Sequence, residues 1–251
     1  MVYFVGAGCG APDLITVRGM RLLEKADVII YTGSLVNPEL LSYARDDCEL
    51  YNSAHMHLGQ VIGQMKDAES RGLMTVRLHT GDPCLYGAIR EQMDWLEALH
   101  IPYDYCPGVS AFSGVAAALK AEYTLPEVSQ SVIITRMAGR TSVPEKESIR
   151  GLAAHGATMV IFLSAGMLKE LSSELLAGGY DRDCPAAIVY KASWPEEKVL
   201  RCHVADLAKT AEAEGITKTA LIVVGNVLGD DYALSKLYDA GFSTGYRQTE
   251  E

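Results

Sequence analysis

The sequence lacks the features that mark membrane and secreted proteins. Its 251 residues contain no apolar run approaching the roughly 18–20 residues that cross a bilayer, so no membrane association is expected. The opening residues, Met1–Gly6, read as a strand and carry no basic region or cleavage site. A secretory signal is therefore not expected, and we expect a cytoplasmic protein.

Paired cysteines and an excess of positive charge are also missing. The six cysteines never occur with CxxC spacing, which argues against a zinc site or a redox dithiol and favours reduced thiols. The chain has 22 Lys and Arg residues and 32 Asp and Glu residues, giving a net charge of −10. A nucleic-acid partner is not expected, because it would require a basic stripe. An anionic substrate held by a local basic patch remains compatible with this charge.

The chain does contain a regular alternation of β-branched runs and amphipathic stretches. Strands are predicted at residues 2–5, 28–31, 74–79, 132–135, 158–163, 186–190 and 220–224. Helices are predicted at residues 16–25, 58–71, 89–99, 111–120, 145–154, 167–177 and 204–214. Thr16 is the expected N-cap of the first helix. The alternation predicts an α/β fold with largely parallel sheets.

The pattern is interrupted once, near Tyr123–Glu127. A helix rich in small residues ends there, a proline follows, and the strand pattern restarts. We therefore predict two α/β lobes, formed by residues 1–125 and 126–240, followed by a polar tail at 241–251.

A first glycine cluster, Gly6–Asp13, separates a predicted strand from a predicted helix. It formally fits the GxGxxA pattern of dinucleotide folds. Pro12 and Asp13 delay the helix until about Thr16, and the next strand ends in Thr32–Ser34 with no acid for a ribose hydroxyl. Dinucleotide binding is therefore disfavoured, while a structural glycine turn stays open.

A second cluster, Thr80–Gly87, directly follows a predicted strand. Gly81 lets the backbone approach a ligand closely, and Pro83 stiffens the loop. Asp82 can accept hydrogen bonds from hydroxyl or ammonium donors. The plainer alternative is a turn in which Asp82 caps the next helix.

A third segment, Cys106–Ala111, combines a Pro-Gly turn with Ser110 as a possible cap, ahead of a helix of small residues. Close packing is the plainer explanation for these residues. However, each of the three loops follows a strand at its carboxyl end, which is the edge where open α/β sheets bind ligands. We therefore predict the active site at this edge.

Taken together, these motifs resemble the signatures of the tetrapyrrole methylases. Val5–Gly10 with Asp13–Thr16 and Gly19 resembles the opening signature, Thr80–Gly87 the second and Pro107–Ala111 the third. The segments 161–164, 185–189 and 219–222 align in the same order, so the resemblance spans about the first 228 residues. The family usually places proline at the position of Cys9, whose backbone can still serve a ligand.

The resemblance implies a homodimeric methyltransferase that binds S-adenosylmethionine in a folded conformation, in the cleft between the two lobes. Asp82 is the side chain expected to make a polar contact with this co-substrate. The matching positions expected to line its pocket are Cys9, Thr80, Gly81, Asp82, Leu85, Ser110, Ala111, Ser164, Ala187 and Ala220.

Two further segments indicate a branch of the family. Tyr31–Val36 and Asn52–Met56 resemble the branch that methylates carbon 11 of precorrin-4, or of its cobalt form, in cobalamin biosynthesis. The uroporphyrinogen branch carries an acid at the position of Thr32 and a lysine near Ala54. Four alternatives stay open: another tetrapyrrole methylase activity, diphthine synthase, an NAD-dependent oxidoreductase, and a sensing module without turnover.

A corrinoid precursor of this kind is a polycarboxylate, so basic side chains should contact it. Arg136, Arg140 and Lys191 follow predicted strands and are the candidates, with solvated surface charges as the alternative. His55 and His57 have no further ligands nearby in the sequence, so no protein-bound metal is expected. Any cobalt would arrive inside the substrate, and no catalytic base can be assigned from the sequence.

Overall fold

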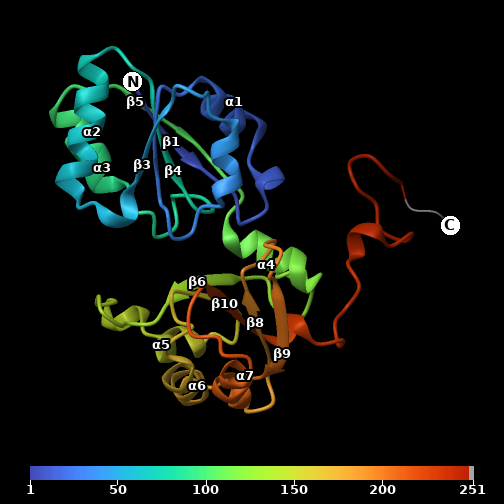
Figure 1. Cartoon of the computed structure of the whole chain (residues 1–251). Coiled ribbons are helices and arrows are strands. Elements are labelled where there is room, and N and C mark those ends of the chain that lie inside the picture. The colour runs from blue at the N-terminus through green and yellow to red at the C-terminus, as the bar shows by residue number, and fades with distance from the viewer. Residues whose placement is uncertain (249–251) are drawn as a thin grey trace. The chain divides into compact units, whose positions relative to one another are not determined.

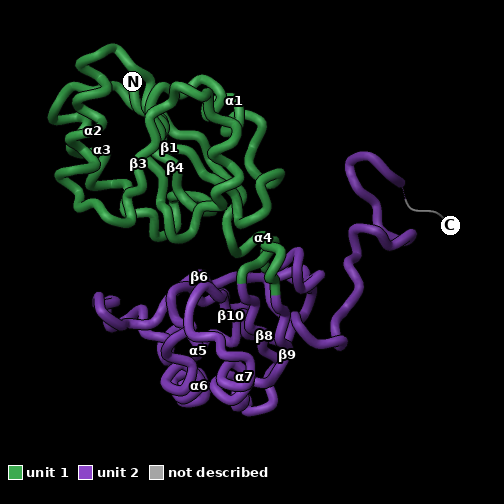
Figure 2. The backbone as a smooth tube through the Cα atoms, viewed as in Figure 1, with its two compact units in different colours: residues 1–115, 191–197 green, residues 116–190, 198–251 purple. Residues whose placement is uncertain are grey.

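The computed structural model describes residues 1–248, which form two compact units (Figure 2). Unit 1 contains Met1–Val115 together with Lys191–Glu197, and unit 2 contains Ala116–Tyr190 and the chain from Lys198 onward. The assignment of separate domains to 1–125 and 126–240 stays a prediction, and the last three residues of the predicted tail at 241–251 lie outside the described range.

Unit 1 is built on a five-stranded parallel sheet in the order β3-β2-β4-β1-β5. Its strands are β1 (Val2–Gly6), β2 (Val28–Tyr31), β3 (Glu49–Asn52), β4 (Thr75–His79) and β5 (Tyr103–Cys106). Its helices include α1 (Val17–Lys25), α2 (Leu58–Ser70) and α3 (Arg90–Ala98). Figure 1 shows α1 on one side of the sheet and α2 and α3 on the other.

The two faces of this sheet have separate apolar cores because successive side chains of a strand point to opposite faces. On β1, Val5 packs in the core that includes Leu23 of α1. Phe4 packs in the other core, with Met65 of α2 and Leu96 of α3. Both faces are therefore covered, as is usual for a parallel sheet.

The start of α1 agrees with the sequence. Residues 12–14 form a short 3-10 turn, and α1 begins only after Thr16, whose hydroxyl oxygen accepts a hydrogen bond from the Gly19 amide at 3.0 Å. The predicted delay of this helix and its predicted N-cap are both confirmed.

Unit 2 is built on a mixed five-stranded sheet in the order β6-β7-β10-β8-β9. Its strands are β6 (Val132–Arg136), β7 (Thr158–Phe162), β8 (Pro185–Tyr190), β9 (Lys198–His203) and β10 (Ala220–Val224). Only β6 and β7 pair in parallel, whereas the other neighbouring strands are antiparallel. The prediction of a largely parallel sheet is thus correct for unit 1 and wrong for unit 2, where a hairpin joins β8 directly to β9.

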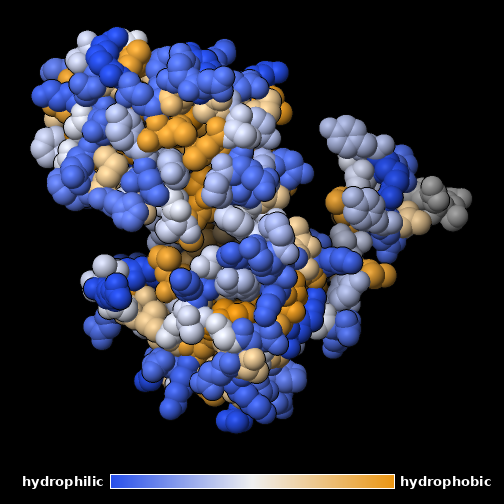
Figure 3. Space-filling view, viewed as in Figure 1, coloured by the Kyte–Doolittle hydropathy of each residue, from blue (hydrophilic) through white to orange (hydrophobic). Residues whose placement is uncertain are grey.

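The helices α5 (Ile149–Ala153), α6 (Leu168–Ala177) and α7 (Leu207–Ala213) pack on this mixed sheet. The core of unit 2 contains Met159 of β7, Leu171 of α6 and Ile222 of β10. Within residues 1–248, no helix is long and apolar enough to cross a membrane. Hydrophilic residues cover much of the face that Figure 3 presents for each unit.

Candidate functional site

The three glycine-containing loops meet at one edge of the parallel sheet. They follow β1, β4 and β5, which are neighbours in the sheet and run in the same direction. Gly8 and Gly81 pair directly: the Gly81 amide donates to the Gly8 carbonyl at 2.7 Å, and the Gly8 amide donates to the Gly81 carbonyl at 3.3 Å. The prediction that the loops share one edge is confirmed.

Glycine is required where the loops touch. A Cβ atom added to Gly108 would lie 2.3 Å from the carbonyl oxygen of Gly81 and 2.7 Å from the Cα atom of Gly6. One added to Gly6 would lie 2.6 Å from the Cα atom of Gly108. We call this contact of Gly6, Gly81 and Gly108 the glycine junction. It leaves the loop backbones close enough together to present amide and carbonyl groups to one ligand.

Asp82 connects two of these loops. Its side chain is 9% exposed, and its Oδ2 atom accepts a hydrogen bond from the Gly108 amide at 2.9 Å. Its Oδ1 atom accepts from the Cys84 amide at 2.8 Å and from the Tyr105 hydroxyl. The alternative in which Asp82 caps the next helix is wrong, because α3 has Ile89 at its N-cap with no side-chain cap.

These contacts determine the charge states of Asp82 and Tyr105. Burial acts to raise the pKa of Asp82, but the hydrogen bonds from Tyr105, Cys84 and Gly108 outweigh it and lower the pKa below its usual value. Burial first, and the neighbouring Asp82 second, raise the pKa of the Tyr105 phenol. At neutral pH the Asp82 carboxylate beside the glycine junction is therefore charged and is held by the protonated Tyr105 phenol and two amides.

The other expected residues of unit 1 lie on the same loops. Cys9 and Ser110 are each 8% exposed, whereas Thr80, Leu85 and Ala111 are half-buried. Ser110 directly precedes α4 (Ala111–Leu119).

In unit 2, most of the expected residues gather at one edge of the mixed sheet. Ser164 follows β7, and its hydroxyl accepts from the Met137 amide at 3.0 Å and donates to the Phe162 carbonyl at 2.7 Å. Ala220 begins β10 and pairs with Tyr190 at the end of β8. Ala187, by contrast, lies further along β8 and is fully buried.

The three expected basic side chains have different surroundings. Arg136 donates to the carbonyl oxygens of Met137 and Thr141, both at 3.2 Å, and of Ser142 at 2.7 Å. These acceptors are neutral, so they brace the loop after β6 without cancelling the charge of Arg136. Arg140 is exposed on this loop. Lys191 belongs to unit 1, where its Nζ atom lies 3.5 Å from Glu196 Oε1.

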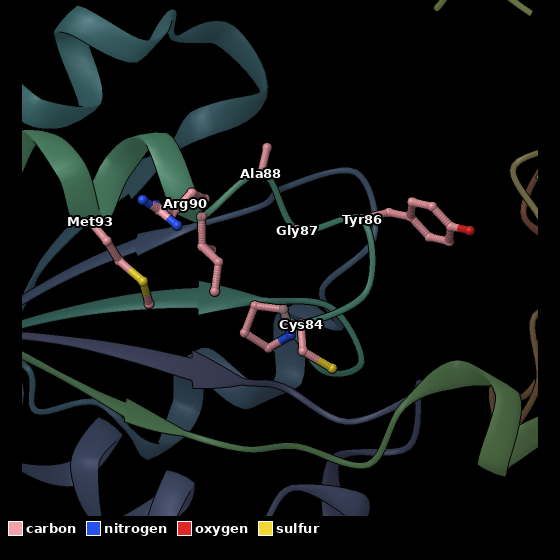
Figure 4. Close-up of a pocket in the computed structure, with 8 residues that line it drawn as sticks. Cys84, Tyr86, Gly87, Ala88, Arg90 and Met93 are labelled. Atoms are coloured by element: carbon pink, nitrogen blue, oxygen red, sulfur yellow. The ribbon is translucent and has the colours of Figure 1, made fainter. Parts of the chain in front are cut away.

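A pocket that the sequence analysis did not predict adjoins the second loop. Its volume is about 340 Å³, and it is lined by Pro83, Cys84, Tyr86, Gly87, Ala88, Ile89, Arg90 and Met93 (Figure 4). Tyr86 points away from the other labelled side chains. Tyr86 and Ala88 both have left-handed backbone conformations, with φ of 58° and 49°, a strained geometry that often occurs near functional sites. None of the expected cofactor residues lines this pocket.

Two buried polar residues of β4 were also missed. Arg77 is 6% exposed and donates to Gln92 Oε1 and the Ile30 carbonyl, each at 3.1 Å. His79 is 5% exposed, and burial, with a smaller contribution from Arg77, lowers its pKa to about 3. The period-2 alternation of polar residues in Thr75–His79 was the available signal.

Among residues 1–248, which the structure describes, no group of three His, Cys, Asp or Glu side chains could hold a metal ion. His55 and His57 are both exposed.

Comparison with known proteins places this geometry in a family. The family described as Tetrapyrrole (Corrin/Porphyrin) Methylases matches residues 1–208. A cobalt-precorrin-4 C(11)-methyltransferase of Methanocaldococcus jannaschii is 52% identical over 100% of this chain and 97% of its own length. A precorrin-4 C(11)-methyltransferase of Pseudomonas aeruginosa is 46% identical over 99% of each chain.

Solved structures agree with the sequence relatives. The crystal structure of a cobalamin biosynthetic enzyme, cobalt precorrin-4 methyltransferase, superposes with a TM-score of 0.89 at 44% identity, covering 91% of this chain and 96% of its own. The uroporphyrin-III C-methyltransferase of Thermus thermophilus, in complex with S-adenosyl homocysteine, superposes with a TM-score of 0.73 at 25% identity over 91% and 93% of the two chains. The chain described here belongs to the tetrapyrrole methylases.

Proposed function

We propose that this chain transfers a methyl group from S-adenosylmethionine to carbon 11 of cobalt-precorrin-4 or precorrin-4, a step in cobalamin biosynthesis. The observation that carries the proposal is the likeness, along the whole chain, to archaeal and bacterial enzymes of that name. The two names differ in whether the substrate contains cobalt. Both forms of the substrate therefore belong in the assay.

The glycine junction is the proposed binding place for the methyl donor on unit 1. Its loops present backbone amides and carbonyls at one sheet edge, beside the half-buried side chains of Thr80 and Leu85 and the negative charge of Asp82. A carboxylate there favours the positively charged sulfonium and ammonium groups of the donor. The full proposed set is Cys9, Thr80, Gly81, Asp82, Leu85, Ser110 and Ala111 of unit 1, with Ser164, Ala187 and Ala220 of unit 2.

The proposed reaction needs no covalent nucleophile from the protein. The bound donor supplies a methyl group on a sulfonium; the carbon–sulfur bond breaks and leaves a thioether, while an electron pair of the macrocycle forms the new carbon–carbon bond. The positive charge passes to the macrocycle, which restores its charge by losing a proton. The chain's residues hold the two reactants in line and keep water out, which can supply most of the acceleration.

Arg136, Arg140 and Lys191 are proposed to bind the substrate carboxylates. The Arg136 guanidinium donates to neutral carbonyls of its own loop, which do not cancel its charge. Arg140 is exposed on the same loop. Both remain able to attract an anionic ligand. Guanidinium groups suit this work because they can bind a carboxylate through two parallel hydrogen bonds.

We further propose a homodimer in the cytoplasm. All six cysteines are free, which fits a reducing compartment. Leu234 and Tyr238, after the last strand, are 82% and 83% exposed, and a second copy of the chain would bury such side chains. Light scattering on the full chain should give twice the mass of one chain, and cell fractionation should recover it with cytosolic markers.

Isothermal calorimetry tests the donor site. S-adenosylhomocysteine should bind to the wild type and bind more weakly to Asp82→Ala, whereas NADH should give no heat of binding. Binding of NADH alone would overturn the proposal and indicate that the first glycine loop binds a dinucleotide.

A further inference from the structure

The loop Lys191–Glu197 belongs to unit 1 although the strands on either side of it belong to unit 2. It joins β8 to β9 in an antiparallel hairpin, with Tyr190 opposite Lys198. In Figure 2 this loop carries the colour of unit 1. We call it the hairpin loop.

The hairpin loop contacts the first glycine loop through two neighbouring residues. The Ser193 hydroxyl oxygen accepts a hydrogen bond from the Ala11 amide at 3.0 Å and lies 3.5 Å from the Cys9 sulfur. A Cβ atom added to Gly10 would lie 2.4 Å from Trp194 Cδ1 and 2.6 Å from Trp194 Nε1. The indole therefore occupies the space that any side chain at position 10 would need.

Gly10 is also held by a second contact. The buried Asn37 side chain donates from Nδ2 to the Gly10 carbonyl at 3.0 Å. Gly10 is thus fixed through its carbonyl by Asn37 and through its Cα atom by Trp194. Because Gly10 follows Cys9 directly, these contacts set the backbone that the proposed donor would meet.

The conformation of the hairpin loop is itself closely defined. Lys191 and Ser193 are left-handed, with φ of 47° and 66°, a costly geometry that persists only where surrounding contacts hold it. The Ser193 amide donates to Glu197 Oε2 at 2.6 Å, and the Trp194 amide donates to the Lys191 carbonyl at 3.0 Å. The Lys191 ammonium lies 5.1 Å from the centre of the Trp194 ring, within cation–π range.

Resting on the function proposed above, we propose that Trp194 is a positioning residue of the methyl-donor site. Its indole packs against Gly10 and, together with Ser193, holds the first glycine loop in the conformation that binds the donor. Trp194 acts through the backbone at Cys9–Ala11 and takes no part in the chemical step. Its loss should therefore weaken donor binding and leave turnover at saturating donor almost unchanged.

Intrinsic fluorescence tests the contact without altering it. The chain has two tryptophans, and the other, Trp95, lies on α3 and is 52% exposed. In a Trp95→Phe protein all tryptophan emission comes from Trp194. S-adenosylhomocysteine should shift this emission with a midpoint equal to the Kd measured by calorimetry. Unchanged emission in a protein that binds the ligand by calorimetry overturns the inference, whereas absence of any heat counts against the proposed function instead.

Substitution tests the energetic role. Trp194→Ala should raise the Kd for S-adenosylhomocysteine and the KM for S-adenosylmethionine by about tenfold, because binding of the donor would then also have to order the first glycine loop. Trp194→Phe should restore most of the affinity, and Trp95→Ala is the matched control that should leave it unchanged. Wild-type affinity in Trp194→Ala would overturn the inference.

A second variant covers the case in which Trp194→Ala fails to fold. Ser193→Ala removes the acceptor for the Ala11 amide and the hydroxyl contact with the Cys9 sulfur, and it should weaken donor binding in the same direction, with turnover at saturating donor retained. A folded Ser193→Ala protein with unchanged donor affinity and unchanged Trp194 emission on binding would contradict the proposal.

Discussion

The Gly108 amide donates to the Asp82 carboxylate at 2.9 Å, so a side chain of the second loop holds the backbone of the third. Gly108 also packs against Gly6 of the first loop. A single carboxylate therefore links loops that are far apart in the sequence. The shape of the proposed donor site depends on this contact.

Asp82→Asn tests that contact with almost no change in volume. In one orientation the asparagine N–H faces the Gly108 amide, which loses its acceptor. In the other it faces the Cys84 amide and the Tyr105 hydroxyl, which both lose the carboxylate, although the Cys84 amide keeps the Tyr105 oxygen as an acceptor. We expect a loss of about 1–3 kcal/mol in the free energy of unfolding and about tenfold weaker binding of S-adenosylhomocysteine. Urea denaturation and calorimetry measure the two effects. Asp46→Asn, at an exposed position, should change neither.

Gly108→Ala tests the glycine junction. The added methyl group would meet the Gly81 carbonyl, so we expect severe destabilisation or separation of the loops with loss of donor binding. Gly63→Ala in α2 is the opposite case, because a Cβ there meets nothing within 4 Å. It should raise the free energy of unfolding by up to about 1 kcal/mol. Wild-type stability and affinity in Gly108→Ala would show that the junction is looser than described.

His79 gives the protein a defined pH dependence. Its pKa is about 3 in the folded protein and near 6.5 when unfolded, so the unfolded chain binds the extra proton between these values. The contribution of neutral His79 to the free energy of unfolding should be fully present above pH 6.5. It should decrease as the pH drops toward 3, by at most about 1.4 kcal/mol per pH unit. Urea midpoints measured across this range should vary less in His79→Gln, while the exposed-site control His155→Gln should follow the wild type.

Arg136 and Arg140 should differ in what their removal costs. Arg140→Ala should raise the KM for the corrinoid substrate only, because the side chain is exposed. Arg136→Ala should raise that KM and also lower thermal stability, because it removes the hydrogen bonds that brace residues 137–142. Arg182→Ala, at another exposed arginine of unit 2, is the control. Unchanged corrinoid affinity in the double variant would remove both residues from the substrate site.

The sequence predicted the central strands and one edge strand, β6, and missed the other three edge strands. β2 and β10 have the predicted bounds, because buried strands carry continuous apolar runs. β3, β5 and β9 each lie at the edge of a sheet, where one side of the strand is open and polar residues are tolerated. Their mixed sequences therefore gave no clear strand signal.

The loops of the site were predicted, but their connections were not. Glycine and proline mark a turn locally, whereas Gly108, which Asp82 binds, and Ser193, which Ala11 binds, lie far along the chain. Ser193 is separated from Ala11 by 182 positions, and nothing in the local pattern around Trp194 indicates that its indole meets Gly10. Such contacts arise from the tertiary fold and need a structure to be seen.

Turnover with the proposed substrates tests the central claim most directly. The purified protein would be incubated with S-adenosylmethionine labelled in its methyl group and, separately, with cobalt-precorrin-4, metal-free precorrin-4 and uroporphyrinogen III. We predict that one labelled methyl group is transferred to carbon 11 of a precorrin-4 substrate, located by NMR, with one S-adenosylhomocysteine formed per product. Transfer to uroporphyrinogen III alone, or binding of the donor without transfer to any of the three, would contradict the account.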